Sequence, residues 1–148
     1  MGTAGALSLI EQDFEKPFYV INGDLLTKLN FSSMMEYHQK ADNKLTVGAR
    51  EYEFTIPYGV LNVDEANKVS DLIEKPTYKD FVNAGIYILE PELHNRIPQN
   101  EFYDMTDLLE ELIEEDENVG IFPVHEFWMD IGEPKDYKEA NNKHINKF

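Results

Sequence analysis

The amino-acid sequence predicts an α/β domain with a mixed, mostly parallel sheet. Short continuous apolar runs at residues 18–21 and 45–49 are typical of strands that are buried on both faces of a sheet. Segments with helical spacing of apolar residues alternate with such runs, and one predicted hairpin interrupts the alternation. The length of 148 residues suits one ordinary domain, and no linker stands out, so we expect a single unit over residues 1–148.

In the first third of the chain, we expect a turn and short helix, a buried strand and a longer helix. They cover residues 1–11, 18–21 and 33–41. The turn cluster Asn22-Gly23-Asp24 ends the strand. Ser33 and Glu36 have the spacing of a capping box, which predicts that the longer helix begins at Ser33.

Short strands make up most of the remaining chain. The predicted strands are 45–49, 58–63, 68–73, 81–89, 119–124 and 127–129, with helices at 91–96, 107–117 and 134–142. Residues 58–63 and 68–73 form the hairpin, with a four-residue loop between them. Thr106 is the predicted N-cap of the helix at 107–117.

Composition excludes several classes of function. Lys and Arg number 13 and Asp and Glu 29, and the resulting net charge of −16 argues against a broad surface for nucleic acid or anionic membranes. The absence of cysteine excludes disulfides, zinc–thiolate sites and thiol nucleophiles. No apolar run approaches the roughly 20 residues of a membrane span, and residues 1–10 do not resemble a signal peptide, so we expect a cytoplasmic protein.

Two carboxylates follow predicted strands and lie near glycines. Asp24 follows the strand at 18–21, and Asp130 follows Trp128-Met129 and precedes Ile131-Gly132. Ligand sites in α/β sheets form at the carboxyl ends of strands, so the two acids could jointly hold Mg²⁺. The alternative is ordinary turn chemistry, since Asp beside Gly is common after a strand.

Two further motifs could bind a polar ligand. Glu74-Lys75-Pro76 follows the hairpin, and Pro76 predicts an extended backbone at Lys75, so both side chains would serve one ligand only if the backbone bends there. The alternative is an exposed strand end. The segment that starts at Gly2 places small residues at a helix start, where free N–H groups could bind a ligand. The four histidines show no metal-ligand spacing.

Taken in order, the motifs resemble those of the sugar-1-phosphate nucleotidyltransferases. The motifs are GTAGAL from Gly2, FYVINGD ending at Asp24, YGV around Gly59, EKP at 74–76, NAGIYIL from Asn83, and WMDIGEPKDY around Asp130. The closest likeness is to mannose-1-phosphate guanylyltransferase-like and glucose-1-phosphate thymidylyltransferase-like members. The resemblance implies a layered, Rossmann-like nucleotidyltransferase fold, and it covers essentially the whole chain.

The resemblance also implies a reaction and roles for single residues. The family joins a sugar 1-phosphate to a nucleoside triphosphate, here GTP or dTTP, and releases pyrophosphate. The implied catalytic residues are Asp24 and Asp130, as Mg²⁺ ligands, and Lys75, which would grip the sugar phosphate. The other implied binding residues are Gly2 for the base, Gly59, Asn83 and Gly85 around the sugar, and Glu74 on its hydroxyls.

The sequence departs from the family at its start. The family's glycine-rich phosphate loop and Pro-Lys-Pro element lie upstream of GTAGAL, and this chain has neither. It therefore resembles the C-terminal two-thirds of such a domain, and we expect it to be inactive alone. Strand 18–21 should become an exposed sheet edge that favours homo-oligomers. The alternative function is a non-catalytic, nucleotide-sugar-binding or regulatory module of the same fold.

Overall fold

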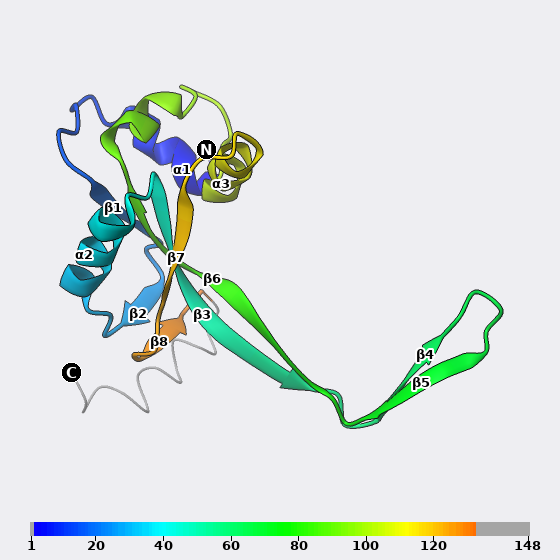
Figure 1. The fold of residues 1–148 in the computed structure, drawn as a ribbon. Helices are drawn as coiled ribbons and strands as arrows, with labels where there is room; N and C mark the ends of the chain where they lie inside the picture. Colours follow the sequence, from blue (N-terminus) through cyan, green and yellow to red (C-terminus); the bar gives the residue numbers. More distant parts are fainter. Residues whose placement is uncertain (1, 133–148) are drawn as a thin grey trace. The chain divides into compact units, whose positions relative to one another are not determined.

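The computed structural model describes residues 2–132, and the chain divides into two compact units (Figure 1). Among the described residues, the larger unit contains 2–49 and 83–132, and the smaller unit contains 50–82. The predicted helix at 134–142 lies outside the described residues. The expectation of a single domain over 1–148 stays a prediction. No helix among residues 2–132 is long and apolar enough to span a membrane.

The central sheet has four strands in the order β1-β6-β3-β7 (Figure 1). These strands are β1 (Phe18–Ile21), β6 (Thr77–Leu89), β3 (Leu45–Thr55) and β7 (Val119–Pro123). β1 runs antiparallel to β6, whereas β3 runs parallel to β7. The predicted mixed sheet is therefore confirmed. β1 lies at one edge of the described sheet, as expected from the sequence.

Parallel pairing does not predominate among the described strands. The hairpin at residues 59–74 connects β3 to β6, and no helix lies between them, so β3 and β6 run antiparallel. Thr55 contacts Thr77 and Glu51 pairs with Lys79, as expected for antiparallel neighbours. These contacts also explain why β3 and β6 extend beyond the predicted apolar runs, into residues that are exposed.

Apolar side chains from the two faces of the sheet form two cores. Tyr87 and Leu89 alternate with Ile86 and Ile88 along β6, so the two pairs point to opposite faces. The first face packs against α1 (Gly2–Gly5), η1 (Ala6–Leu9), η2 (Pro91–Arg96) and α3 (Met105–Glu114). The second face packs against α2 (Phe31–Ala41), which contributes the fully buried Met34 (Figure 1).

Both long helices begin earlier than the sequence predicts. The N-cap of α2 is Asn30, whose side-chain oxygen accepts a hydrogen bond from the Ser33 N–H at 3.1 Å. The N-cap of α3 is Asp104, and the Asp107 carboxylate accepts from the Asp104 N–H at 2.7 Å. The predicted caps Ser33 and Thr106 are therefore wrong. Asn and Asp cap helices as well as Ser and Thr do, so residue type alone does not distinguish Asn30 from Ser33, or Asp104 from Thr106, as the N-cap.

Two small antiparallel ribbons complete the described fold. One pairs β2 (Leu25–Thr27) with β8 (Trp128–Asp130) in the larger unit. The other pairs β4 (Gly59–Val63) with β5 (Val69–Glu74) and confirms the predicted hairpin. The Asp64 carboxylate closes its loop by accepting from the Ala66 and Lys68 N–H groups, both at 2.9 Å.

Candidate active site

The β2–β8 ribbon brings Asp24 and Asp130 together. Leu25 pairs with Asp130, and the Ile131 N–H donates to the Asp24 carbonyl at 2.8 Å. A Cβ atom added to Gly132 would lie 3.1 Å from Asp130 Oδ1 and 3.3 Å from Asp24 Oδ2. Two carboxylates that are more than a hundred residues apart in sequence therefore converge beside Gly132.

The donor chemistry of this pair suits a hard divalent cation. Both carboxylates are exposed, and neither forms an ion pair with a Lys or Arg among the described residues. No group of three or more potential His, Cys, Asp or Glu ligands occurs within residues 2–132. Mg²⁺ is commonly bound by one or two carboxylates with water and phosphate oxygens in the remaining positions, so two carboxylates fit it.

A polar strip made of Asn22, Asn83 and Gly85 lies beside the core on the first face of the sheet. Asn22 comes directly after β1, two residues beyond Val20, and Asn83 and Gly85 precede Tyr87 on β6 with the same two-residue spacing. The Asn22 N–H donates to the Gly85 carbonyl at 2.9 Å, so the pairing extends to these residues. Gly85 has φ +69°, and a Cβ atom there would lie 2.7 Å from Asn22 Nδ2. The glycine therefore leaves room for the Asn22 amide.

Hydrogen bonds fix the Asn83 side chain at this strip. Its Oδ1 accepts from the Gly85 N–H at 2.9 Å, and its Nδ2 donates to the Tyr87 hydroxyl at 2.8 Å. Burial raises the pKa of Tyr87, which keeps the hydroxyl protonated. Asn83 and Gly85, both of which the family resemblance assigned to the sugar pocket, are thus parts of one hydrogen-bonded surface.

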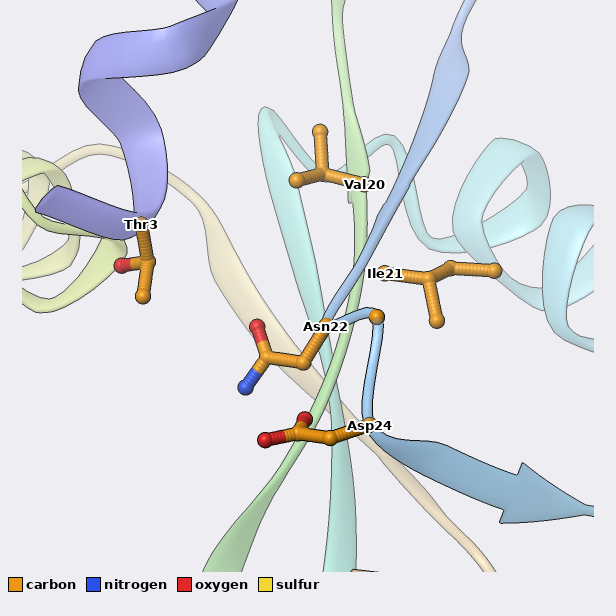
Figure 2. A pocket seen from close by; sticks show the side chains of 6 residues that line it. Thr3, Val20, Ile21, Asn22 and Asp24 are labelled. Carbon is orange, nitrogen blue, oxygen red and sulfur yellow. The ribbon is translucent and has the colours of Figure 1, made fainter. Parts of the chain in front are cut away.

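Two cavities open over the strip. The first, of about 430 Å³, is lined by Thr3 and residues 20–24, with the Asn22 and Asp24 side chains reaching toward the side on which Thr3 lies (Figure 2). The second, of about 340 Å³, is lined by Thr3, Asn22, Asn83, Gly85, Tyr87, Asp104 and Thr106. No Lys or Arg is among the described residues that line either cavity. Neutral amides and hydroxyls of this kind suit the hydroxyl groups of a sugar ring.

The N–H groups at the start of α1 are largely occupied. Ala4 and Gly5 donate to the Tyr103 carbonyl at 3.1 and 2.9 Å, and the Thr3 N–H donates to Asp104 Oδ1 at 2.6 Å. The expectation that these groups are free for a ligand is therefore wrong for residues 3–5. Gly2 has φ +73°, and a Cβ atom there would lie 2.4 Å from the Tyr103 carbonyl oxygen. Close packing thus explains why this position is a glycine.

In the smaller unit, the structure brings Gly59 and Glu74 together. They pair across β4 and β5, and a Cβ atom on Gly59 would lie 3.0 Å from Glu74 Oε2. Lys75 has φ +46°, and its N–H donates to the Tyr58 carbonyl at 3.3 Å. The extended backbone predicted from Pro76 is therefore wrong, because the chain bends at Lys75. This bend is the feature that would let Glu74 and Lys75 serve one ligand.

Sequence reasoning did not assign a binding role to several residues that line the cavities. Asn22 stood inside a motif but was counted as a turn residue, and Tyr87 could have been found because it alternates with Gly85 on β6. Thr3 lay inside the motif that starts at Gly2 but was given no role of its own. Asp104 carried no signal, because its importance depends on a contact between segments about a hundred residues apart.

Comparison with known proteins identifies the family of this chain. A family model described as "Nucleotidyl transferase" matches residues 1–147. The chain belongs to the nucleotidyl transferase family. The match covers the polar strip and both converging carboxylates, and it confirms the resemblance drawn from the motifs.

Curated relatives within this family include mannose-1-phosphate guanyltransferases. The Saccharomyces cerevisiae protein is 34% identical over 157 residues, which cover 100% of this chain and 43% of that protein. Mannose-1-phosphate guanyltransferase 2 of Candida glabrata is 34% identical over 146 residues, which cover 93% of this chain and 40% of that protein. The chain thus spans less than half the length of these relatives.

Solved structures share the nucleotidyltransferase-like fold. HddC from Yersinia pseudotuberculosis, in a complex with GMP-PN, aligns with a TM-score of 0.62 and 28% identity over 96% of this chain and 62% of that chain. A candidate glucose-1-phosphate thymidylyltransferase from Bacillus anthracis aligns with a TM-score of 0.67 over 95% of this chain and 60% of that chain. At 20% identity, the second likeness shows the fold alone.

Proposed function

We propose that this chain is part of an enzyme that transfers a nucleoside monophosphate from a nucleoside triphosphate to a sugar 1-phosphate. The products are pyrophosphate and a nucleoside-diphosphate sugar. The convergence of Asp24 and Asp130 beside Gly132 carries the proposal, because phosphoryl chemistry of this kind depends on charge neutralisation at the phosphates. Membership of the nucleotidyl transferase family supports it.

Asp24 and Asp130 would together hold Mg²⁺. When bound, the cation supplies positive charge to the phosphate oxygens of the substrates. In the reaction, an oxygen of the sugar phosphate bonds to the α-phosphorus while the bond from that phosphorus to pyrophosphate breaks, so no covalent enzyme intermediate is needed. Because the carboxylates would hold the metal ion and the ion would face the phosphates, a protein with a net charge of −16 could still bind anionic substrates.

The other site residues would bind and orient the two substrates. Asn83 and Gly85 would line the sugar pocket, which the polar strip and the second cavity support. Glu74 would accept hydrogen bonds from sugar hydroxyls beside Gly59, and Lys75 would neutralise the sugar phosphate. The family role of Gly2 is a backbone contact to the base. Guanine is the favoured base, and GTP is preferred over dTTP because the curated relatives described above are named guanyltransferases.

The 148-residue chain alone should have little transferase activity. The described cavity linings contain no cationic side chain, so a triphosphate would meet only the charge that a metal ion brings. The relatives also extend well beyond the matched region. The cytoplasmic location belongs to the same proposal, since nucleoside triphosphates are available there.

A pyrophosphate-release assay tests the proposal. The assay would use GTP and mannose 1-phosphate with Mg²⁺, comparing this chain with a chimera that joins it to the preceding segment of the yeast guanyltransferase. We expect turnover by the chimera, no more than background from the 148-residue chain, and loss of turnover in the chimera's Asp24→Asn variant. An inactive chimera that folds and binds both substrates would contradict the enzyme assignment, and robust release by the chain alone would contradict its inactivity.

The second candidate is a non-catalytic module that binds a nucleotide sugar. The amides and hydroxyls in the cavity linings, together with the lack of Lys and Arg among the described lining residues, favour it, since sugar hydroxyl groups could bind there without turnover. The Asp24→Asn chimera separates the two functions. An enzyme should lose turnover, whereas a binding module should keep most of its affinity for the nucleotide sugar.

Self-association through β1 is part of the proposal for this chain. β1 pairs only with β6 in the described sheet, so its other edge presents unpaired backbone N–H and C=O groups. A second copy could add a strand to this edge.

A further inference from the structure

Residues 103–105 hold helix α1 through five hydrogen bonds. The Tyr103 carbonyl accepts from the Ala4 and Gly5 N–H groups. Asp104 Oδ1 accepts from the Thr3 N–H at 2.6 Å and from the Thr3 hydroxyl at 3.0 Å. The Met105 N–H in turn donates to Thr3 Oγ1 at 3.0 Å. Thr3 is therefore held at three points by a segment about a hundred residues away.

The segment that holds α1 is itself fixed in the core. Tyr103 is 7% exposed and Met105 is 1% exposed, and both pack in the cluster that contains Leu108 and Leu112 of α3. Asp107 accepts from the Asp104 N–H and closes the first turn of α3. Residues 103–105 can therefore act as a rigid support for a neighbouring segment.

Helix α1 cannot hold its own position. It has four residues, and helices of this length are not stable by themselves. Its first residue, Gly2, has a positive φ and packs against the Tyr103 carbonyl so closely that no side chain would fit. The place of Thr3 in the fold therefore depends on Tyr103 and Asp104.

Thr3 borders both cavities of the candidate active site. In the first cavity, it lies across from Asn22 and Asp24 (Figure 2). A ligand that fills this cavity with phosphates near Asp24 would place its nucleoside near Thr3. We infer that Asp104 is a positioning residue for the nucleoside triphosphate, which acts by holding Thr3 and the rest of α1 against the cavity. This inference rests on the proposed function.

Two matched pairs of substitutions test the inference. Asp104→Ala and Thr3→Val remove the hydrogen bonds between the two side chains, whereas Asp104→Asn and Thr3→Ser retain an acceptor and a hydroxyl. Amide hydrogen exchange of residues 2–5 in this chain measures the tether, and calorimetric titration of the yeast chimera and its variants with GTP and Mg²⁺ measures the ligand site. Thr3→Val leaves the α3 cap intact, so it covers the case in which Asp104→Ala fails to fold.

We expect Asp104→Ala and Thr3→Val to speed the exchange of residues 2–5 and to weaken GTP binding by about tenfold, as loss of a hydrogen bond to a charged group would. Asp104→Asn and Thr3→Ser should match the wild type in both measurements. Unchanged exchange in the first pair, or faster exchange with unchanged GTP affinity, would overturn the inference. So would weak binding by Asp104→Asn with normal exchange, because that pattern indicates direct contact through the charge. A wild-type chimera that folds and binds no GTP would contradict the proposed function instead, and the exchange data would still report on the tether.

Discussion

Buried His38 shows how single residues satisfy their polar groups in this fold. The imidazole is fully buried between Thr46, 2.8 Å from its Nδ1, and Glu90, 3.2 Å from its Nε2. Asn43 donates to Thr46 Oγ1, which leaves the Thr46 hydroxyl hydrogen for Nδ1, while Nε2–H donates to Glu90. Every group in this network is satisfied with a neutral histidine. Burial lowers the pKa of His38, and Glu90 opposes that shift only in part.

This arrangement predicts a pH-dependent stability. Because the pKa is lower in the folded state than in the unfolded state, the unfolded chain binds the proton more readily below about pH 6.5. The contribution of neutral His38 is fully present above that pH and is lost as the pH falls through the folded pKa. The unfolding free energy of the wild type should therefore fall between about pH 7.5 and 5.5 more steeply than that of His38→Gln.

Denaturant unfolding at a series of pH values checks this prediction, and exposed His125 provides the control. His125→Gln should keep the slope of the wild type. Equal slopes for wild type and His38→Gln would show that His38 does not titrate differently on unfolding.

Among the helices and strands, the end of each element was harder to predict than its existence. The apolar run at 18–21 became β1 with the predicted bounds, and the predicted hairpin formed, although its loop covers residues 64–68 rather than 64–67. Residues 50–55 were not predicted as strand, although Glu51 and Glu53 alternate there with Tyr52 and Phe54. Residues 51–55 are exposed, and pairs such as Lys79 with Glu51 hold β3 there rather than burial. Pro76 likewise could not reveal the bend at Lys75, since the hairpin overrides the local preference.

The cap of α2 gives a direct test at this scale. Asn30 supplies the side chain that bonds the Ser33 N–H, whereas Ser33 is exposed and lies inside the helix. Asn30→Ala should lower the unfolding free energy by about 1 kcal/mol, and Ser33→Ala should change it by less than about 0.5 kcal/mol. Thermal or denaturant unfolding of the two variants decides between the caps. A larger loss of unfolding free energy in Ser33→Ala than in Asn30→Ala would show that Ser33 is the N-cap, as predicted from the sequence.

At the scale of the molecule, the unpaired side of β1 should control self-association. Ile21, at the end of this strand, is 43% exposed, and a lysine there would disfavour the addition of another strand. Sedimentation of the wild-type chain should show dimers or larger species that increase with concentration, and Ile21→Lys should reduce them at least several-fold.

Ile113 on α3 is 60% exposed and lies away from any sheet edge, so Ile113→Lys is the matched control. It should associate like the wild type. Association that Ile21→Lys leaves unchanged, or that both variants reduce equally, would rule out β1 as the interface.

The convergence of Asp24 and Asp130 could be predicted, because each acid follows a predicted strand and the motifs occur in the same order as in the family. The ribbon that joins them was predicted only in part. The predicted strand at 127–129 is β8, shifted by one residue, whereas β2 was not predicted because its three residues are too few to carry a periodic signal. The support of Thr3 by Asp104 was equally hidden, since it depends on the packing of α1 against α3.

The most direct test of the account is the binding of Mn²⁺, as a paramagnetic substitute for Mg²⁺, measured by electron paramagnetic resonance. The wild-type chain should bind one Mn²⁺ more tightly than the rest, and Asp24→Asn and Asp130→Asn should each weaken that site by about tenfold or more. The double variant should be little worse than either single variant, since both acids serve one ion. Asp13→Asn, an exposed acid outside the site, should bind like the wild type. If both single variants bind Mn²⁺ as tightly as the wild type does, or lose no more Mn²⁺ affinity than Asp13→Asn does, the claim that these two carboxylates form one metal site is contradicted.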